Sequence, residues 1–187
     1  MVRTPANDRS PALELTTSAL LAALLAASAV VTVPIGAVPL TLQTLVLVLI
    51  TLTQKPKRAA LSVGVYLAAG LVGLPVFSGM RGGFGVVLGP TGGFLLGFLA
   101  GALAGAWVRE RLEASVSWEV VSDVAAAATV IAVVYAFGWL QLALVTSMGA
   151  VPALLAGVVP FLVPDALKAA GAIALAPLVR SAMRGRP

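Results

Sequence analysis

An all-α integral membrane protein with six transmembrane helices is the fold that this sequence predicts, and three observations support it. Of the 187 residues, 60% are hydrophobic and only 10% are charged, whereas soluble domains carry about 25% charged residues. Six apolar stretches are separated by short polar segments or by segments rich in proline and glycine. The cations lie almost entirely at the ends of these stretches. We therefore expect a multi-pass protein embedded in a lipid bilayer.

The chain is expected to form one membrane domain, residues 15–187, after a flexible, polar N-terminal arm, residues 1–14. We expect no cleavable signal peptide, because the first apolar run is long enough to span. The predicted spans are residues 15–33, 40–53, 59–74, 91–107, 120–137 and 150–179. The second is shorter than the roughly 20 residues of a straight crossing, and we expect the turn before it to supply the missing length. Pro160 and Pro164 are expected to kink the last span.

The distribution of cations orients the spans. With a cytosolic N-terminus, most of the 12 cations fall in cytosolic segments. These are Arg3, Arg9, Lys55, Lys57, Arg58, Arg109, Arg111, Arg180, Arg184 and Arg186. Only Arg81 falls in an outer loop, and Lys168 falls inside a span. Since cytosolic loops carry an excess of Lys and Arg, we expect six spans with both termini in the cytoplasm. The other outer connection, residues 138–149, is expected to be an apolar loop.

The stretch from Gly73 to Gly105 is the most unusual part of the sequence. It ends one apolar span, breaks into a loop rich in glycine and proline, and enters the next span. The loop also carries many apolar side chains, for which water is a poor environment. Irregular backbone at membrane depth is tolerated only where it is buried in protein or lines a cavity. We interpret this loop as the wall of a binding site, with a plain outer loop as the alternative.

Asp165 and Lys168 stand three residues apart inside an apolar span. Ionisable groups at that depth cost at least about 2.5–3.5 kcal/mol each on insertion scales. At this spacing they share one helical face and can pair. One interpretation is an ion pair that only makes insertion tolerable. We favour a ligand-facing role, because apolar residues could replace a purely structural pair without loss. A carboxylate beside an ammonium suits a small polar ligand with both donors and acceptors.

Two ridges of small residues have different interpretations. Glycine recurs every four residues at Gly93, Gly97, Gly101 and Gly105, and such a ridge lets a neighbouring helix approach closely. We expect this ridge to pack inside the protein. A similar ridge in the first span consists of Ala19, Ala23 and Ala27. It could pack internally or dock onto another membrane subunit.

The remaining polar candidates are few, and several kinds of chemistry are missing from the sequence. Arg81 could capture an anionic group or be a solvated loop residue, and Gln43 could bind a ligand or cap the second span. The chain has no Cys or His, which removes thiol chemistry, Cys/His metal sites and a serine–histidine triad. It has no P-loop motif for ATP. Its charges lie at span ends and form no basic face, so we expect no nucleic-acid partner.

Four motifs in the sequence are specific enough to compare with known families. The longest is G-L-P-V-F-S-G…G-G…L-G-P-T-G-G-F-L-L-G-F, residues 73–98. Three others are V-P-I-G-A-V-P-L-T-L-Q-T (33–44), K-P-K-R-A-A-L-S (55–62) and P-D-A-L-K (164–168). Together they resemble the BioY family, the biotin-binding substrate (S) components of energy-coupling-factor (ECF) transporters. The resemblance implies six membrane helices with long ligand-covering loops and high-affinity biotin uptake across the cytoplasmic membrane. It also implies that the chain is not an enzyme and needs no cofactor or metal.

The resemblance implies a ligand site and a docking surface. Asp165 and Lys168 would lie at the ligand. The predicted biotin-binding residues are Gln43, Phe77, Arg81, Phe84, Thr91, Gly92, Phe94, Asp165 and Lys168. The alanine ridge Ala19, Ala23 and Ala27 would dock to a transmembrane coupling subunit that works with two ATPase subunits. Many members of the family have Tyr at the position of Phe94, so a hydroxyl contact is lost here.

Three alternatives remain open at this stage. The nearest is an S component for a different vitamin or small metabolite on the same scaffold. An enzyme using Asp165 and Lys168 as acid and base is a second, but Asp123 is the only other carboxylate within a predicted span. A stand-alone channel is the third, although its polar lining should run through several spans.

Overall fold

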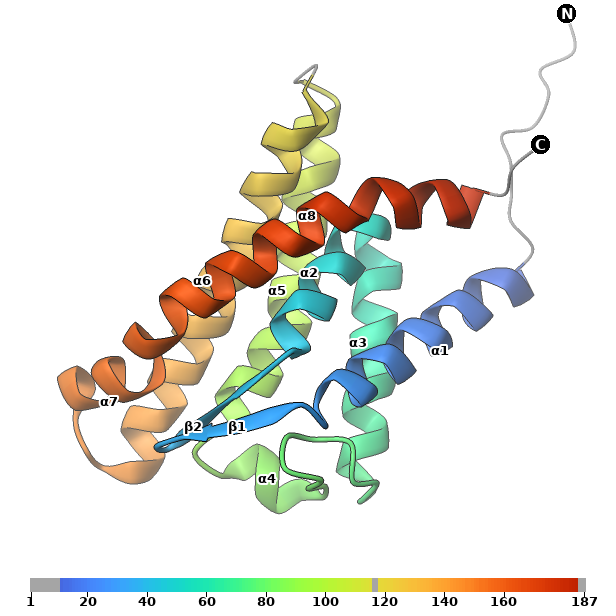
Figure 1. Cartoon of the computed structure of the whole chain (residues 1–187). Coiled ribbons are helices and arrows are strands. Elements are labelled where there is room, and N and C mark those ends of the chain that lie inside the picture. The colour runs from blue at the N-terminus through green and yellow to red at the C-terminus, as the bar shows by residue number, and fades with distance from the viewer. Residues whose placement is uncertain (1–10, 116–117, 185–187) are drawn as a thin grey trace, which may run out of the picture.

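The computed structural model of the chain describes residues 11–115 and 118–184, and Figure 1 shows a bundle of helices with a small hairpin at one end. The elements are α1 (Pro11–Ser28), β1 (Thr32–Ile35), β2 (Val38–Thr41), α2 (Gln43–Thr53), α3 (Pro56–Leu71), α4 (Phe84–Leu88), α5 (Gly92–Glu113), α6 (Glu119–Thr146), α7 (Ala150–Gly157), the 3₁₀ turn η1 (Val159–Phe161) and α8 (Leu162–Arg184). Most of the predicted N-terminal arm, residues 1–10, lies outside the described residues. The end of that arm, residues 11–14, already belongs to α1.

The short helix α2 forms the centre of the bundle (Figure 1). Nine of its 11 residues are buried, including Leu47, Ile50 and Leu52. It packs against α8, α5, α6 and α1, so neighbouring helices cover it on nearly every side. A helix that is hydrophobic all round belongs in the interior of a protein. This position explains why α2 can be too short for a straight crossing.

The six longest helices, α1, α2, α3, α5, α6 and α8, follow the six predicted spans in order. By length and apolar composition, three helical stretches of the described chain are able to cross a membrane: α5, α6 and Ala150–Met183. The apolar helices Leu15–Ser28 and Gln43–Thr53 are shorter. The helical membrane fold is therefore confirmed, while the count of six crossings and the cytoplasmic termini stay predictions.

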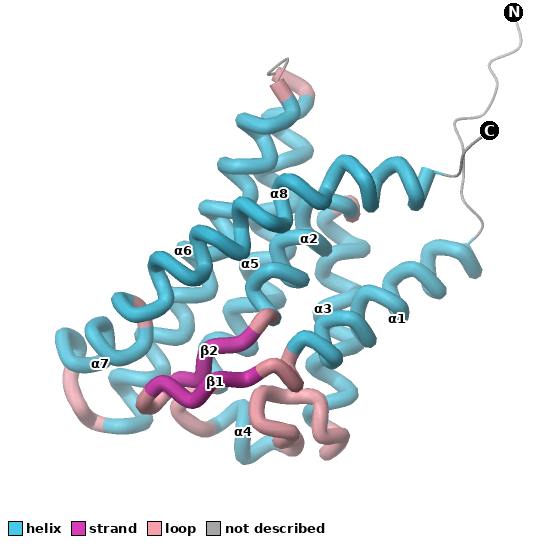
Figure 2. Tube along the Cα trace, in the orientation of Figure 1, coloured by secondary structure: helices cyan, strands magenta, loops and turns pink. Residues whose placement is uncertain are grey.

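The turn predicted before the second span is present, but the ends predicted for the two spans that flank it were wrong. The first span was expected to reach Val33 and the second to begin at Leu40, whereas the structure has an antiparallel hairpin between them, with Ile35 paired to Val38 (Figure 2). Gly36 opens the two-residue turn with φ of +63°, a conformation that glycine adopts without steric cost. Because the apolar residues of β1 continue the hydrophobic run of α1, the sequence pattern did not mark the end of the helix.

The last third of the chain also differs from prediction. Residues 138–146 continue α6 as helix, where a loop was expected. The predicted kink at Pro160 is a full break, in which α7, η1 and α8 succeed one another. Pro164 lies in the first turn of α8, where a missing backbone N–H costs nothing.

The glycine ridge packs inside the protein, as predicted. A Cβ atom on Gly93 would lie 2.2 Å from the Phe137 carbonyl oxygen, and one on Gly97 would lie 2.9 Å from Val134 Cα. Further along the ridge, Gly105 approaches Ala126 equally closely. The backbones of α5 and α6 therefore touch along this line, and side chains there would separate them.

Replacing Gly97 with alanine should destabilise the protein because Val134 Cα leaves no room for a methyl group. We expect Gly97→Ala to lower the unfolding free energy by about 1–3 kcal/mol. Gly64 in α3 is the matched control, since a Cβ there meets nothing within 4 Å and alanine is the better helix former. Thermal unfolding in detergent measures both variants, and a Gly97→Ala protein as stable as Gly64→Ala would contradict this packing.

Candidate ligand-binding site

A cavity lies at the end of the bundle where the hairpin meets the first residues of α2, α5 and α8. The cavity and its open mouth contain about 620 Å³ of space not filled by atoms. The predicted site residues that line it are Gln43, Phe77, Arg81, Thr91, Phe94, Asp165 and Lys168.

Asp165 is the centre of the polar wall. Its carboxylate is buried, and Lys168 Nζ donates to Oδ1 at 2.8 Å. On the other side, Tyr135 Oη donates to Oδ2 at 2.8 Å. Each carboxylate oxygen can accept two hydrogen bonds, and an ammonium can donate three. The hydrogen-bonded group of Asp165, Lys168 and Tyr135 can therefore accept a hydrogen bond from a ligand N–H and donate one to a ligand oxygen without breaking its internal bonds.

Tyr135 is a cavity residue that the sequence analysis missed. It lies in α6, 30 residues before its partner Asp165. Tyrosines of membrane helices are enriched at the two membrane–water interfaces. The position of Tyr135 deep within an apolar run was therefore the sequence signal that could have identified it as a site residue. Its hydroxyl fixes the direction of the Asp165 carboxylate across the contact between α6 and α8.

Gln43, at the start of α2, is fixed on two sides. Its Nε2 donates to Tyr66 Oη at 2.7 Å, and its Oε1 accepts from Thr41 Oγ1 at 3.2 Å. The ring of Phe77 packs edge-on against Tyr66, with centroids 5.6 Å apart. Phe77 also lies directly over Gly70, where a Cβ would come within 2.0 Å of the ring. The part of the cavity wall that Gln43 and Phe77 form is therefore rigid. Gln43 makes it polar on one side, and Phe77 makes it apolar on the other.

Arg81 lies at the mouth of the cavity. Its side chain is exposed, and Nε donates to the Ser78 carbonyl oxygen at 3.1 Å. Backbone hydrogen bonds in both directions join Phe77 and Arg81. A guanidinium here is placed to meet an anionic group.

Three predicted residues at the start of α5 and in α4 have different positions. The ring of Phe94 lines the cavity and packs over Gly138. Gly92 lies outside the lining, at a contact so close that a Cβ would lie 1.7 Å from the Val87 carbonyl oxygen. Phe84 also lies outside it and is 67% exposed. The reason is helical geometry: Val86, two residues later, faces the cavity, so Phe84 lies on the other side of α4.

The alanine ridge of α1 faces outward. Ala19, Ala23 and Ala27 are all exposed, while Ala22 is buried. Internal packing therefore uses the adjacent face of α1, and the ridge is left on the surface of this chain.

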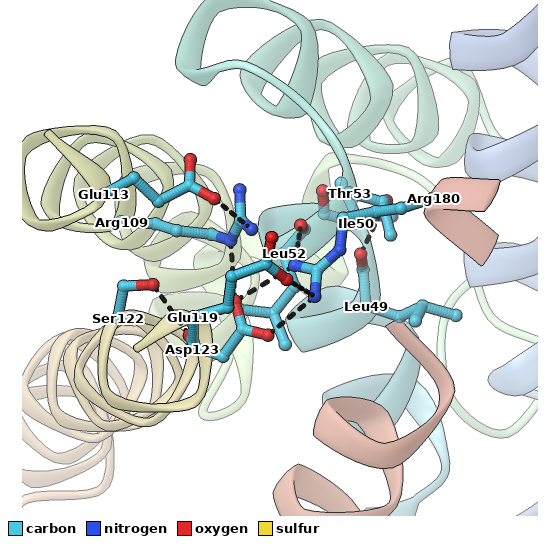
Figure 3. Close-up of polar contacts among 10 residues, drawn as sticks. All are labelled: Leu49, Ile50, Leu52, Thr53, Arg109, Glu113, Glu119, Ser122, Asp123 and Arg180. Atoms are coloured by element: carbon cyan, nitrogen blue, oxygen red, sulfur yellow. Dashed lines mark hydrogen bonds and ion pairs between the residues drawn. The ribbon is translucent and has the colours of Figure 1, made fainter. Parts of the chain in front are cut away.

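At the opposite end of the bundle from the cavity, a cluster of charges joins α5, α6 and α8 (Figure 3). Arg180 binds the buried Asp123 through two bonds, from Nη1 to Oδ1 at 3.1 Å and from Nη2 to Oδ2 at 3.0 Å. Arg109 Nε donates to the same Oδ1 at 2.7 Å, and Arg180 also reaches the Leu52 carbonyl oxygen at 3.3 Å. The cluster fixes the far end of α8, the helix that carries Asp165 and Lys168.

Together, the fold and the cavity define a helical membrane protein with a small-molecule pocket at one end of its bundle. Comparison with known sequences gives the family. Residues 4–185 match the BioY family, and the chain belongs to that family.

Two curated relatives and one solved structure extend this comparison. The chain is 36% identical to the probable biotin transporter BioY of Pyrococcus horikoshii, over 87% of this chain and 93% of the relative. It is 34% identical to the biotin transporter BioY of Rhizobium etli, over 80% of each chain. A crystal structure of the S-component for biotin from an ECF-type ABC transporter superposes with a TM-score of 0.86, covering 94% of both chains at 25% identity. The fold is therefore that of an S component.

Proposed function

We propose that this chain binds biotin and serves as the substrate-specific component of an ECF transporter for biotin uptake. The observation that carries the proposal is the cavity: Asp165, Lys168 and Tyr135 form one hydrogen-bonded group in its wall. The fold around this cavity matches that of an S-component for biotin. Relatives that align with most of the chain are named biotin transporters.

The chemistry of biotin suits this cavity. Biotin has a ureido group with two N–H donors and one carbonyl, an apolar sulfur-containing ring and a valerate carboxylate. In the proposed complex, Asp165 accepts a ureido N–H and Lys168 donates to the ureido oxygen beside it. Phe77 and Phe94 pack against the apolar ring. Arg81, at the mouth, meets the carboxylate of the tail.

Equilibrium binding tests the proposed function. The full chain in lipid nanodiscs is titrated with labelled biotin, and a panel of other vitamins is then added as competitors. We expect saturable binding of one biotin per chain that only biotin and its close analogues displace. Displacement by another vitamin at lower concentration than biotin would assign the site to that vitamin.

The proposed partners are a transmembrane coupling subunit and two ATPase subunits, with the chain in the cytoplasmic membrane. The exposed ridge of Ala19, Ala23 and Ala27 supports this proposal, because small side chains let another membrane helix approach closely. The proposed role is binding and handing over the substrate, with no chemical change to it.

A tryptophan on this ridge should block assembly and leave the ligand site intact. We expect Ala23→Trp to abolish co-purification of the coupling subunit and biotin uptake, with biotin affinity within about twofold of wild type. Ala128→Trp, on an exposed position of α6, is the control and should assemble normally. Co-purification of Ala23→Trp at the wild-type level would contradict docking at the ridge, and loss of biotin binding would show that the ridge supports the fold.

A further inference from the structure

The unexpected extension of α6 brings Gln141 to the short helix α4. Its Nε2 donates to the carbonyl oxygens of Val87 and Gly89, both at 2.8 Å. Carbonyls at the C-terminal end of a helix have no partner within that helix, and α4 ends at Leu88. One amide group therefore uses both of its N–H donors on two backbone acceptors at the end of α4. The Gly89 carbonyl oxygen also accepts from the Gly92 amide at 3.1 Å.

The backbone around this contact is closely packed. A Cβ on Gly92 would lie 1.7 Å from the Val87 carbonyl oxygen and 2.6 Å from Gln141 Nε2. A Cβ on Gly93 would lie 2.7 Å from Gln141 Cβ. The end of α4, the start of α5 and the last turns of α6 thus meet at one junction, which requires glycine on the α5 side.

This junction matters because the segment it holds covers part of the cavity. The segment from Phe77 to Thr91 contributes cavity residues at both of its ends and, through Val86, from α4 itself. The N-terminal side of α4 is tied down by the Gly83 amide, which donates to the Gly70 carbonyl oxygen at 2.6 Å. Its outer face is exposed, with Leu88 at 72%. Gln141 supplies the corresponding tie at the C-terminal end.

We propose that Gln141 is a positioning residue for ligand retention: by clamping α4 to α6, it keeps Val86 and the covering segment in place over the bound ligand. This inference rests on the proposed function, since the ligand is taken to be biotin. Gln141 itself lies outside the cavity lining, so its effect on the ligand passes through α4. In this proposal the ligand leaves when the covering segment moves, so a clamp that opposes this movement slows release.

The test compares biotin release from wild type and from Gln141→Met, which is nearly isosteric but has no N–H donor. Full-length protein in nanodiscs is loaded with labelled biotin and chased with an excess of unlabelled biotin. We expect release to be about tenfold faster. Gln141→Asn, one methylene shorter, should shift release in the same direction. Release at the wild-type rate in both variants would overturn the clamp.

Gln54→Met is the matched control. Gln54 is buried at the other end of α2 and accepts a hydrogen bond from Ser62 Oγ at 2.8 Å. The same substitution there also removes a buried polar contact, so it reproduces the general loss of stability. We expect its biotin release rate to equal that of wild type. Release accelerated equally in both glutamine variants would show a general loosening and would overturn the specific role of Gln141.

Hydrogen–deuterium exchange of the ligand-free protein separates the clamp from the identity of the ligand. Gln141→Met should raise exchange of amides in residues 84–91 and leave residues 43–53 of α2 unchanged. If wild type retains no biotin, the proposed function fails. The exchange measurement still shows whether Gln141 holds α4 against α6. Unchanged exchange in residues 84–91 would overturn it.

Discussion

Asp165→Asn weakens biotin binding by about 10–100-fold, because the ligand N–H loses a charged acceptor. Hydrogen bonds to charged groups contribute about 1.5–3 kcal/mol, and each 1.4 kcal/mol is a factor of ten in affinity. The substitution keeps the size of the side chain and an oxygen that can still accept from Lys168 or Tyr135. Asp165→Ala should have a larger effect, since it leaves both partners without an acceptor in the cavity wall. Isothermal titration of purified protein measures both.

A carboxylate-to-amide change far from the cavity is the control for this prediction. Glu110 is exposed near the end of α5, whereas the cavity lies at the start of that helix. Glu110→Gln should bind biotin like wild type. If Asp165→Asn binds within about twofold of wild type and only melts earlier, Asp165 and Lys168 form a structural pair and the proposed ligand contact is wrong.

The second large effect concerns the charge cluster at the other end of α8. Asp123→Ala leaves the buried Arg180 and the partly buried Arg109 without their shared carboxylate. Breaking a buried ion pair by removing one partner costs about 3–5 kcal/mol. For a chain of this length we expect the apparent melting temperature to fall by roughly 10 °C. Well below its melting transition, the variant should bind biotin like wild type, since the cluster is remote from the cavity.

Glu119 provides the matched control for Asp123. It also contacts Arg180, at 3.4 Å, but its side chain is 64% exposed, and exposed ion pairs contribute only about 0–1 kcal/mol. Glu119→Ala should therefore melt close to wild type. The double variant Asp123→Ala, Arg180→Leu should recover part of the loss, because it removes the unpaired charge together with its partner. Equal melting temperatures for Asp123→Ala and Glu119→Ala would contradict the importance of burial.

The sequence predicted the features that depend on local pattern. Asp165 and Lys168 stand out because a charged pair inside an apolar run has few explanations. The four-residue spacing of glycine along α5 predicted a close helix contact, although not that α6 would be the partner. Residues 33–44 and 73–98, which carry the two longest motifs of the resemblance, contribute most of the residues that line the cavity.

The features that were missed depend on contacts between distant residues. Tyr135 and Asp165 are 30 residues apart, and Asp123 and Arg180 are 57 apart. Gln141 looked like the interruption of an apolar connection, because its two acceptors lie more than 50 residues away. Residues 138–149 were expected to form a loop, whereas Gly138 lies within α6 and the ring of Phe94 packs over it. In both cases tertiary contacts outweighed local propensity.

A structure of the chain with biotin bound tests the central claim most directly. The account predicts that the ureido group lies within hydrogen-bond distance of Asp165 and Lys168, with the ring against Phe77 and Phe94 and the carboxylate directed toward Arg81. Biotin bound elsewhere, or bound in this cavity with its ureido group turned away from Asp165, would contradict it.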